Sequence, residues 1–191
     1  MTGFDTEPWS IRPGSGEPAD VHVLREMLLE AVCWESGVRA EDRARFAGDP
    51  ELEKWVSRWG RRGDRLIVAE HADRPVGAAW YRLWSADDHS YGFVDATTPE
   101  LGVGVEAPSR GRGVGTALMT ALIRLAARDG FAALSLSVDP RNPARRIYES
   151  LGFHRVGESG ASWTYLLHLD AATAGDHTEC ARGRSRGSRD R

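Results

Sequence analysis

Apolar residues recur every three or four positions in two long segments of the chain. Residues 19–34 follow Pro18 and carry this spacing at Val23, Leu24, Met27, Leu28, Ala31 and Val32. Residues 113–128 carry it at Val114, Leu118, Ala121, Leu122 and Leu125. Both patterns predict amphipathic helices. Shorter helices are predicted over residues 51–59 and over residues 143–150, the latter preceded by Asn142 and followed by Gly152.

Strand-like segments lie between the helices. The clearest is residues 133–138, where leucine and valine alternate with alanine and serine, as in a strand buried on one face. Further strands are predicted over residues 9–12, 66–70, 76–84, 100–106 and 162–169. A short turn joins the second and third of these and predicts a hairpin. No internal repeat is visible, so one domain that combines a sheet with helices is expected.

The composition places the chain among globular proteins, with 41% hydrophobic and 28% charged residues in a length of 191. The net charge of -3 gives no overall electrostatic reason to expect a nucleic acid or an anionic membrane as partner. No apolar run reaches 18 residues, and the first ten residues do not resemble a signal peptide, so a cytoplasmic protein is expected. The two cysteines, Cys33 and Cys180, support neither a disulfide framework nor a cysteine-rich zinc site.

The end of the chain differs in composition from the rest. Residues 1–170 are predicted to form the folded domain, and residues 171–191 a disordered tail rich in Arg, Gly and Ser. An arginine-rich tail can bind nucleic acid, but a tail without aromatic residues is more often a solvated extension. Nucleic-acid binding is therefore only the weaker alternative.

The segment Arg110-Gly111-Arg112-Gly113-Val114-Gly115 stands between a predicted strand and the best predicted helix. Its glycines permit a tight turn that leaves backbone amides uncovered at the positive end of the helix, which suits a phosphate or diphosphate. A plain turn with solvated arginines is the alternative. A Walker loop is excluded because the only lysine, Lys54, lies elsewhere. The dinucleotide-binding fingerprint needs a different glycine spacing.

Two motifs give the sequence a family resemblance. Arg110, Gly113 and Gly115 match the Gln/Arg-x-x-Gly-x-Gly/Ala acetyl-CoA loop, and a second motif is matched by Asn142, Ala144, Tyr148, Gly152 and Phe153. Over residues 9–169 the sequence resembles the GCN5-related N-acetyltransferase (GNAT) superfamily. One departure is Pro108, which stands two residues before the loop arginine instead of the usual three.

The resemblance implies an α+β fold with a central, mostly antiparallel sheet of six to seven strands flanked by helices. The sheet is expected to splay between strands four and five, where the pantetheine arm of acetyl-CoA would lie. Acetyl-CoA is implied as co-substrate, without a metal, and the Val105 N–H is implied as the oxyanion donor. The residues implied to bind the cofactor are Val103, Val105, Arg110, Gly111, Arg112, Gly113, Val114, Gly115, Thr116 and Asn142.

The same resemblance implies direct transfer of an acetyl group to an amine in a ternary complex, with no enzyme nucleophile. Tyr148 is expected to stabilise the departing thiolate, with proton transfer optional because a phenol is the weaker acid. Glu100 is the candidate base, with Asp95 and Glu106 in reserve. The alternatives for Tyr148 and Glu100 are a core aromatic and a solvated carboxylate. A non-catalytic acyl-CoA-binding module is the alternative function, and a homodimer is an open option.

The acceptor is less well indicated. Strand alternation places Gly102 and Gly104 on one face of the fourth strand, where bare backbone is expected to let a substrate approach. The third strand and the loop after it mix aromatic and acidic residues, which suit a cation, although core packing is the alternative. These residues are Trp80, Tyr81, Trp84, Asp87, Asp88, His89, Tyr91, Phe93 and Asp95. Trp34, Trp55 and Trp59 are expected to pack in the first helices, and Cys33 to be buried.

Overall fold

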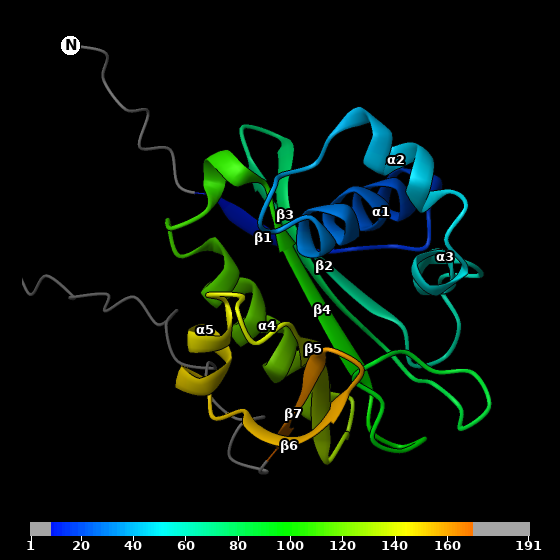
Figure 1. The fold of residues 1–191 in the computed structure, drawn as a ribbon. Helices are drawn as coiled ribbons and strands as arrows, with labels where there is room; N and C mark the ends of the chain where they lie inside the picture. Colours follow the sequence, from blue (N-terminus) through cyan, green and yellow to red (C-terminus); the bar gives the residue numbers. More distant parts are fainter. Residues whose placement is uncertain (1–8, 170–191) are drawn as a thin grey trace, which may run out of the picture.

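The computed structural model describes residues 9–169, which form one mixed sheet covered by helices on both faces (Figure 1). Within this range the sheet order is β1-β2-β3-β4-β5-β7-β6. The strands are β1 (Ser10–Pro13), β2 (Arg65–His71), β3 (Arg74–Arg82), β4 (Glu100–Val105), β5 (Ala133–Val138), β6 (His154–Ser159) and β7 (Ser162–His168). The helices are α1 (Pro18–Val32), α2 (Ala40–Phe46), α3 (Pro50–Val56), the 3₁₀ turn η1 (Ala107–Ser109), α4 (Val114–Arg128) and α5 (Arg145–Ser150).

The sheet opens between β4 and β5. All other neighbouring strands pair antiparallel, whereas β4 and β5 run parallel and are paired only at Glu100 and Ser135. From that point towards Val105 the two strands diverge. The expected mixed sheet with a splay between the fourth and fifth strands is therefore confirmed.

Each face of the sheet has its own hydrophobic core because successive side chains on a strand point to opposite faces. On β3, Trp80 joins a core with α1, α2 and α3, while Tyr81 joins a core with α4 and α5. Helix α4 buries its predicted stripe, including Leu118 and Leu122, in the second core. The two cores hold the helices that line the opening between β4 and β5.

The predicted elements are present, some with shifted boundaries, and three elements were not predicted: α2, β6 and the 3₁₀ turn η1. Helix α2 was not predicted because Phe46 is its only buried residue, which leaves no apolar stripe. Strand β6 was not predicted because its mostly exposed residues give no alternating pattern. Helix α5 begins at Arg145, two residues later than expected, since the Asn142 carbonyl accepts the Arg145 N–H in a preceding turn. The proposed tail, residues 171–191, and Cys180 lie outside the described residues. In the described part of the chain no helix is both long and apolar enough to cross a membrane.

A buried ion pair holds α3 and the segment after it against the sheet. Arg82 on β3 is fully buried and donates to both carboxylate oxygens of Asp64, at 2.9 and 2.7 Å. The same guanidinium donates to the Ser57 carbonyl oxygen at 3.1 Å and lies over the Trp59 ring at 5.0 Å. The charge is thus both neutralised and hydrogen-bonded, as a buried arginine requires.

The glycines of β4 serve helix packing, a role that the sequence did not predict. A Cβ atom on Gly104 would lie 1.9 Å from the Met27 carbonyl oxygen of α1, and one on Gly102 would lie 2.5 Å from the Trp80 ring. The close approach on this face is therefore made by the protein itself.

Replacing Gly104 with Ala is expected to lower the free energy of unfolding by about 1–3 kcal/mol, because α1 must move away from β4 to admit the methyl group. Gly157 on β6 is a matched control, since a Cβ atom there meets nothing within 4 Å. Urea titration of the Gly104→Ala and Gly157→Ala variants measures both effects. Equal losses in the two variants would contradict this packing argument.

Candidate active site

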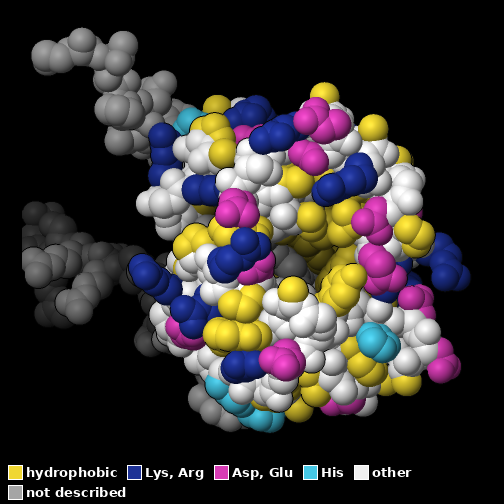
Figure 2. All heavy atoms as spheres, viewed as in Figure 1, with side chains coloured by type: hydrophobic (Ala, Val, Ile, Leu, Met, Phe, Trp, Pro, Cys, Tyr) yellow, Lys and Arg dark blue, Asp and Glu magenta, His cyan; other side chains and the backbone are white. Residues whose placement is uncertain are grey.

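A cavity of about 630 Å³ runs through the opening in the sheet. Its walls come from α1 and α3 on one side and from β4, β5, α4 and α5 on the other. Figure 2 shows the hollow near the centre of this face, with hydrophobic side chains on its walls. Of the predicted catalytic and cofactor residues, the cavity is lined by Glu100, Val103, Val105, Arg110, Gly111, Gly115, Asn142 and Tyr148, whereas Arg112, Gly113, Val114 and Thr116 are not part of the lining.

The glycine loop forms the N-terminal end of α4. Gly111 and Gly113 have φ angles of 73° and 84°, a left-handed region that favours glycine, and Gly113 is the N-cap of α4. In the described part of the chain, no acceptor is found for the amides of residues 111–116. The Val114 side chain is buried in the core, so this residue presents only its backbone. Several free N–H groups at a helix N-terminus make an anion site.

The two arginines of the loop differ in their contacts. Arg110 donates to the Val105 carbonyl oxygen at 2.9 Å, to the Trp34 carbonyl oxygen at 3.0 Å and to the Glu30 carboxylate at 2.8 Å. Its guanidinium therefore ties the end of α1 to the end of β4, and it is less free for a phosphate than the sequence suggested. Arg112 is exposed, and residues 9–169 offer it no ion pair, so its charge is available at the loop.

The open edge of β4 presents unpaired backbone groups. Glu106 N–H donates to the Val76 carbonyl at 3.0 Å, and Gly77 stands opposite Val105, so even-numbered residues of β4 bond to β3. Odd-numbered residues consequently point their N–H and C=O groups at β5. Since β5 pairs with β4 only at Glu100, the amides of Val103 and Val105 face the cavity.

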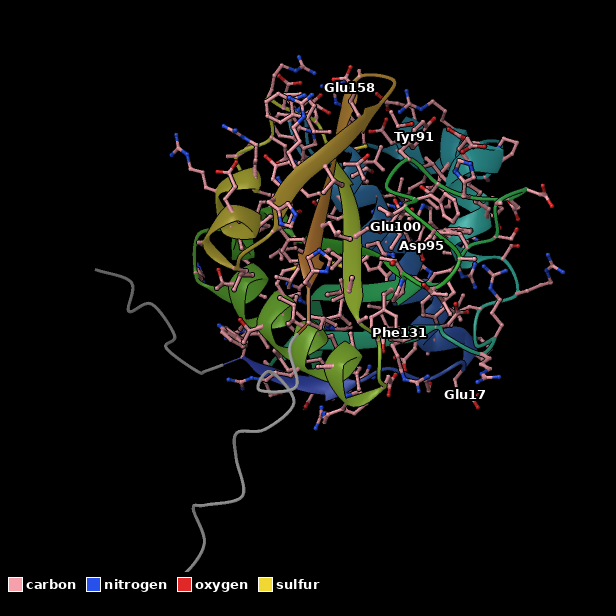
Figure 3. All side chains as sticks on the ribbon, turned by 90° about the horizontal axis from the view of Figure 1, so that it is seen from below. Glu17, Tyr91, Asp95, Glu100, Phe131 and Glu158 are labelled. Atoms are coloured by element: carbon pink, nitrogen blue, oxygen red, sulfur yellow. The ribbon has the colours of Figure 1, made fainter. Side chains whose placement is uncertain are left out.

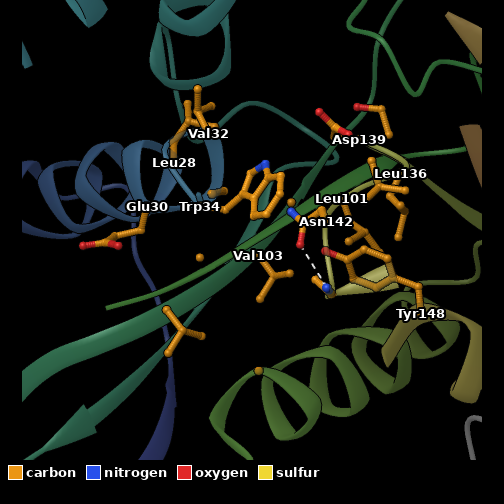
Figure 4. Close-up of a pocket in the computed structure, with 18 of the residues that line it drawn as sticks. Leu28, Glu30, Val32, Trp34, Leu101, Val103, Leu136, Asp139, Asn142 and Tyr148 are labelled. Carbon is orange, nitrogen blue, oxygen red and sulfur yellow. Dashed lines mark hydrogen bonds between the residues drawn. The ribbon is translucent and has the colours of Figure 1, made fainter. Parts of the chain in front are cut away.

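Tyr148 projects from α5 into the same opening. Its ring packs edge-on against Phe153 at 6.3 Å, and its hydroxyl points into the cavity (Figure 4). Burial raises the pKa of Tyr148 to about 12. The nearby Asn142 accepts the Ala144 N–H at 2.9 Å through its side-chain oxygen, which fixes the turn before α5.

Glu100 lies at the narrow end of the opening. It is 1% exposed, and its Oε1 accepts the Gly92 N–H at 2.8 Å. Its Oε2 is buried and finds no partner among residues 9–169. Burial raises the pKa of Glu100 to about 7, against the opposing effect of the Gly92 hydrogen bond. Figure 3 shows Glu100 among the interior side chains, with Tyr91 nearer the edge.

The two reserve carboxylates do not line the cavity. Asp95 accepts from the backbone and hydroxyl groups of Thr97 and Thr98, which close a turn. Glu106 is paired with Arg74 at 2.9 Å. Of the three candidate carboxylates, Glu100 is thus the one that lines the cavity.

The aromatic and acidic residues after β3 do not assemble as one cation site. Trp80 and Tyr91 line the cavity, but the Tyr81 hydroxyl points to the other face of the sheet and donates to Asp129 at 2.6 Å. Trp84 packs edge-on against Trp55 with ring centroids 4.9 Å apart. Cys33 is buried, as expected.

Several cavity residues were not predicted as part of a site. Four of them come from α1 and α3, whose amphipathic pattern marks them only as core positions: Leu28, Val32, Leu52 and Trp55. Val32 is 41% exposed, which is unusual for an apolar helix position and indicates an open cavity wall. This exposure is known only from the structure.

The splayed mixed sheet and the uncovered amides at the N-terminus of α4, beside the open edge of β4, are the arrangement expected of an acyl-CoA N-acyltransferase fold. The sequence model of the acetyltransferase (GNAT) family matches residues 29–153. The chain belongs to this family.

Similar proteins agree with this assignment. A mycothiol acetyltransferase of Kocuria rhizophila is 37% identical over 112 residues, which cover 56% of this chain and 35% of that protein. The chain thus matches about a third of the length of that curated relative. A ribosomal-protein-alanine N-acetyltransferase of Brucella melitensis shares the fold at a TM-score of 0.60 and 23% identity, over 84% of this chain and 99% of that one. A PaiA N-acetyltransferase of Thermoplasma acidophilum, solved with coenzyme A, shares the fold at a TM-score of 0.62 and 15% identity. The match covers 85% of this chain and 99% of that one.

Proposed function

We propose that this chain is an N-acetyltransferase that moves the acetyl group of acetyl-CoA directly to an amine. The observation that carries the proposal is the pair of unpaired backbone surfaces that meet in one cavity. These are the amides of residues 111–116 and the open edge of β4. The first surface suits a diphosphate, and the second suits the amide groups of a pantetheine arm.

The cofactor residues follow from this placement. The amides from Gly111 to Thr116 hold the diphosphate, with the Arg112 side chain adding charge. The backbone of Val103 and Val105 holds the pantetheine, and the Val105 N–H donates to the oxygen of the tetrahedral intermediate. Arg110 positions the loop through its contacts with Glu30 and the Val105 carbonyl oxygen. Asn142 shapes the wall beside Tyr148.

In the reaction, the neutral amine nitrogen attacks the thioester carbonyl carbon, and the C–S bond then breaks. Glu100 accepts, through intervening water, the proton that the amine loses, because Glu100 and Val105 stand at opposite ends of β4. The thiolate is stabilised by a hydrogen bond from Tyr148. Complete proton donation is unfavourable, because the tyrosine pKa of about 12 exceeds that of an ordinary thiol by roughly 3.5 units, or about 5 kcal/mol.

The transfer needs no acyl-enzyme intermediate. Cys33, the cysteine in the described residues, is 7% exposed, and burial raises the pKa of its thiol. It therefore supplies little nucleophilic thiolate. Initial rates measured while both substrates vary should give intersecting lines, typical of a ternary complex, whereas parallel lines would contradict direct transfer.

Tyr148→Phe is expected to lower kcat about 10- to 100-fold and to leave the Kd of acetyl-CoA unchanged. The ring and its contact with Phe153 remain, while the hydrogen bond to a charged thiolate is lost. Thiol release measures kcat, and calorimetry measures Kd. A variant with full kcat would show that the tyrosine is only a packing residue.

The second candidate is a non-catalytic acyl-CoA-binding module. A binding module needs the loop and the β4 edge but neither Tyr148 nor a buried carboxylate beside the cavity. Purified protein can be incubated with acetyl-CoA and a panel of amines, and thiol release can be followed. Binding of acetyl-CoA without turnover on any amine would favour the module over the enzyme.

A further inference from the structure

The part of the cavity on the α1 and α3 face is a chamber with mostly apolar walls. We call it the acceptor chamber, because Trp55 and Trp80 lie towards the Glu100 end of β4, whereas only the Trp34 side approaches Arg110 and the loop of residues 111–116. Its walls are the side chains of Leu28, Val32, Trp34, Leu52, Trp55 and Trp80. Trp55 and Trp80 meet edge-to-face at 6.4 Å, which gives part of this wall a fixed aromatic surface. Figure 4 shows Leu28, Val32 and Trp34 on one side of the opening and Tyr148 on the other.

The charges that line the whole cavity are mainly negative. Three of its carboxylates are paired, namely Glu30 with Arg110, Glu51 with Lys54 and Asp139 with Arg141, at 2.8, 2.7 and 2.8 Å. Arg110 is the only cation among the lining residues, and it is already held by Glu30. A substrate carboxylate that enters the chamber would therefore lose its hydration without meeting a free cation.

Two buried polar atoms of the lining have no partner among residues 9–169, the neutral Trp80 Nε1–H donor and the Glu100 Oε2 acceptor, and of these only the Glu100 oxygen can accept a hydrogen bond from an amine. Glu100 Oε2 is buried without a partner among residues 9–169, and this side chain stands on the same sheet face as Trp80. An amine can use that oxygen once, through a water molecule. A second ammonium group on the same molecule would find the other lining carboxylates, Glu30, Glu51 and Asp139, already paired with Arg110, Lys54 and Arg141. Against the apolar walls it would be buried without a partner, at a large cost.

We infer that the acceptor is a hydrophobic primary monoamine, with an arylalkyl or long alkyl body and no carboxylate near its amino group. This inference rests on the proposed N-acetyltransferase activity. The apolar walls bind the body, and Glu100 receives the amino group through a water molecule. Amino acids are excluded by the missing cation, and polyamines by the single unpaired carboxylate oxygen. A peptide terminus would bring polar backbone groups against the apolar walls.

Matched amines test the inference with the unmodified protein. Tryptamine and tryptophan differ in the carboxylate, and hexylamine and spermidine differ in the number of charges. The kcat/KM for tryptamine should exceed that for tryptophan by about 100-fold, and hexylamine should likewise exceed spermidine. Equal or reversed values would overturn the inference. If a basic peptide is the best acceptor, the inference about the acceptor is overturned but the proposed N-acetyltransferase activity stands. No turnover with any amine would overturn both proposals.

A charge placed in the chamber provides a second test. Leu52 is half-buried in the chamber wall, and Leu52→Arg supplies the missing cation for a carboxylate. The tryptamine-to-tryptophan ratio of kcat/KM should fall about 10-fold or more. Val156→Arg is the control, because Val156 is 47% exposed on β6 and outside the cavity lining. An unchanged ratio in a folded Leu52→Arg variant, or the same fall in Val156→Arg, would contradict the proposed chamber.

Discussion

At pH 9 the Glu100→Gln variant should be more stable to unfolding than the original chain by roughly 3 kcal/mol, while its kcat falls about 100-fold. Burial raises the pKa of Glu100 from the usual 4.5 to about 7. A carboxyl group with a raised native pKa stabilises the fold fully below about pH 4.5, and this contribution is lost as the pH rises through 7. Glutamine has no charge to bury, so the variant keeps that stability at high pH.

Urea titrations at pH 5 and pH 9 measure the effect on stability. The two proteins should differ little at pH 5 and most at pH 9. Glu41→Gln is the control, since Glu41 is exposed on α2 and should not change the dependence on pH. Equal free energies of unfolding at pH 9 would show that Glu100 is not a desolvated carboxylate in the native protein.

The pH profile of activity separates a base from a group that only shapes the fold. In the original chain, kcat/KM should rise with pH through a step near pH 7 as Glu100 loses its proton. The Gln variant should lack this step and keep only the rise that comes from the amine. An unaltered profile would remove Glu100 as the base, whatever the stability data show.

That the glycine loop and Tyr148 border the same cavity could be predicted from the sequence, because the signals are local. Gly113 and Gly115 fall within one turn of a strongly periodic helix, and Tyr148 follows Asn142 by six residues. Spacing of this kind survives folding, because neighbours in the chain stay neighbours in the structure. The alternation on β4 likewise predicted which residues share a face, although the side chains covering that face were not predictable.

The cavity wall formed by α1 and α3 could not be predicted, because its residues meet only through tertiary packing. Trp55 and Trp80 are 25 positions apart and come together because β3 packs under α3. Arg110 is a similar case. Its motif suggested an anion ligand, but its guanidinium is bound to Glu30, 80 positions earlier. Such pairings depend on how α1 packs against β4. No local pattern in the sequence predicts that packing.

The Gly113→Asp variant should lose at least about 100-fold in affinity for acetyl-CoA. Gly113 is the N-cap of α4 with φ 84°, and a Cβ atom there meets nothing within 4 Å, so the side chain can be accommodated. The new carboxylate would stand where free amides are proposed to hold the diphosphate. Two like charges about 4 Å apart repel by about 4 kcal/mol at the effective dielectric of a protein surface. Calorimetry with acetyl-CoA measures the change.

Part of any loss could come from the strained backbone, and Gly130 separates the two causes. It has the same φ of 84°, stands just beyond the other end of α4, and also has no atom within 4 Å of a Cβ position. Gly130→Ala and Gly113→Ala should lose similar stability, about 1–2 kcal/mol each, since both place a side chain in the left-handed region. Only Gly113→Asp should also lose the coenzyme. If Gly113→Asp folds and binds acetyl-CoA as tightly as Gly130→Ala does, the diphosphate does not lie at this helix end, and the proposed acetyl transfer loses its structural basis.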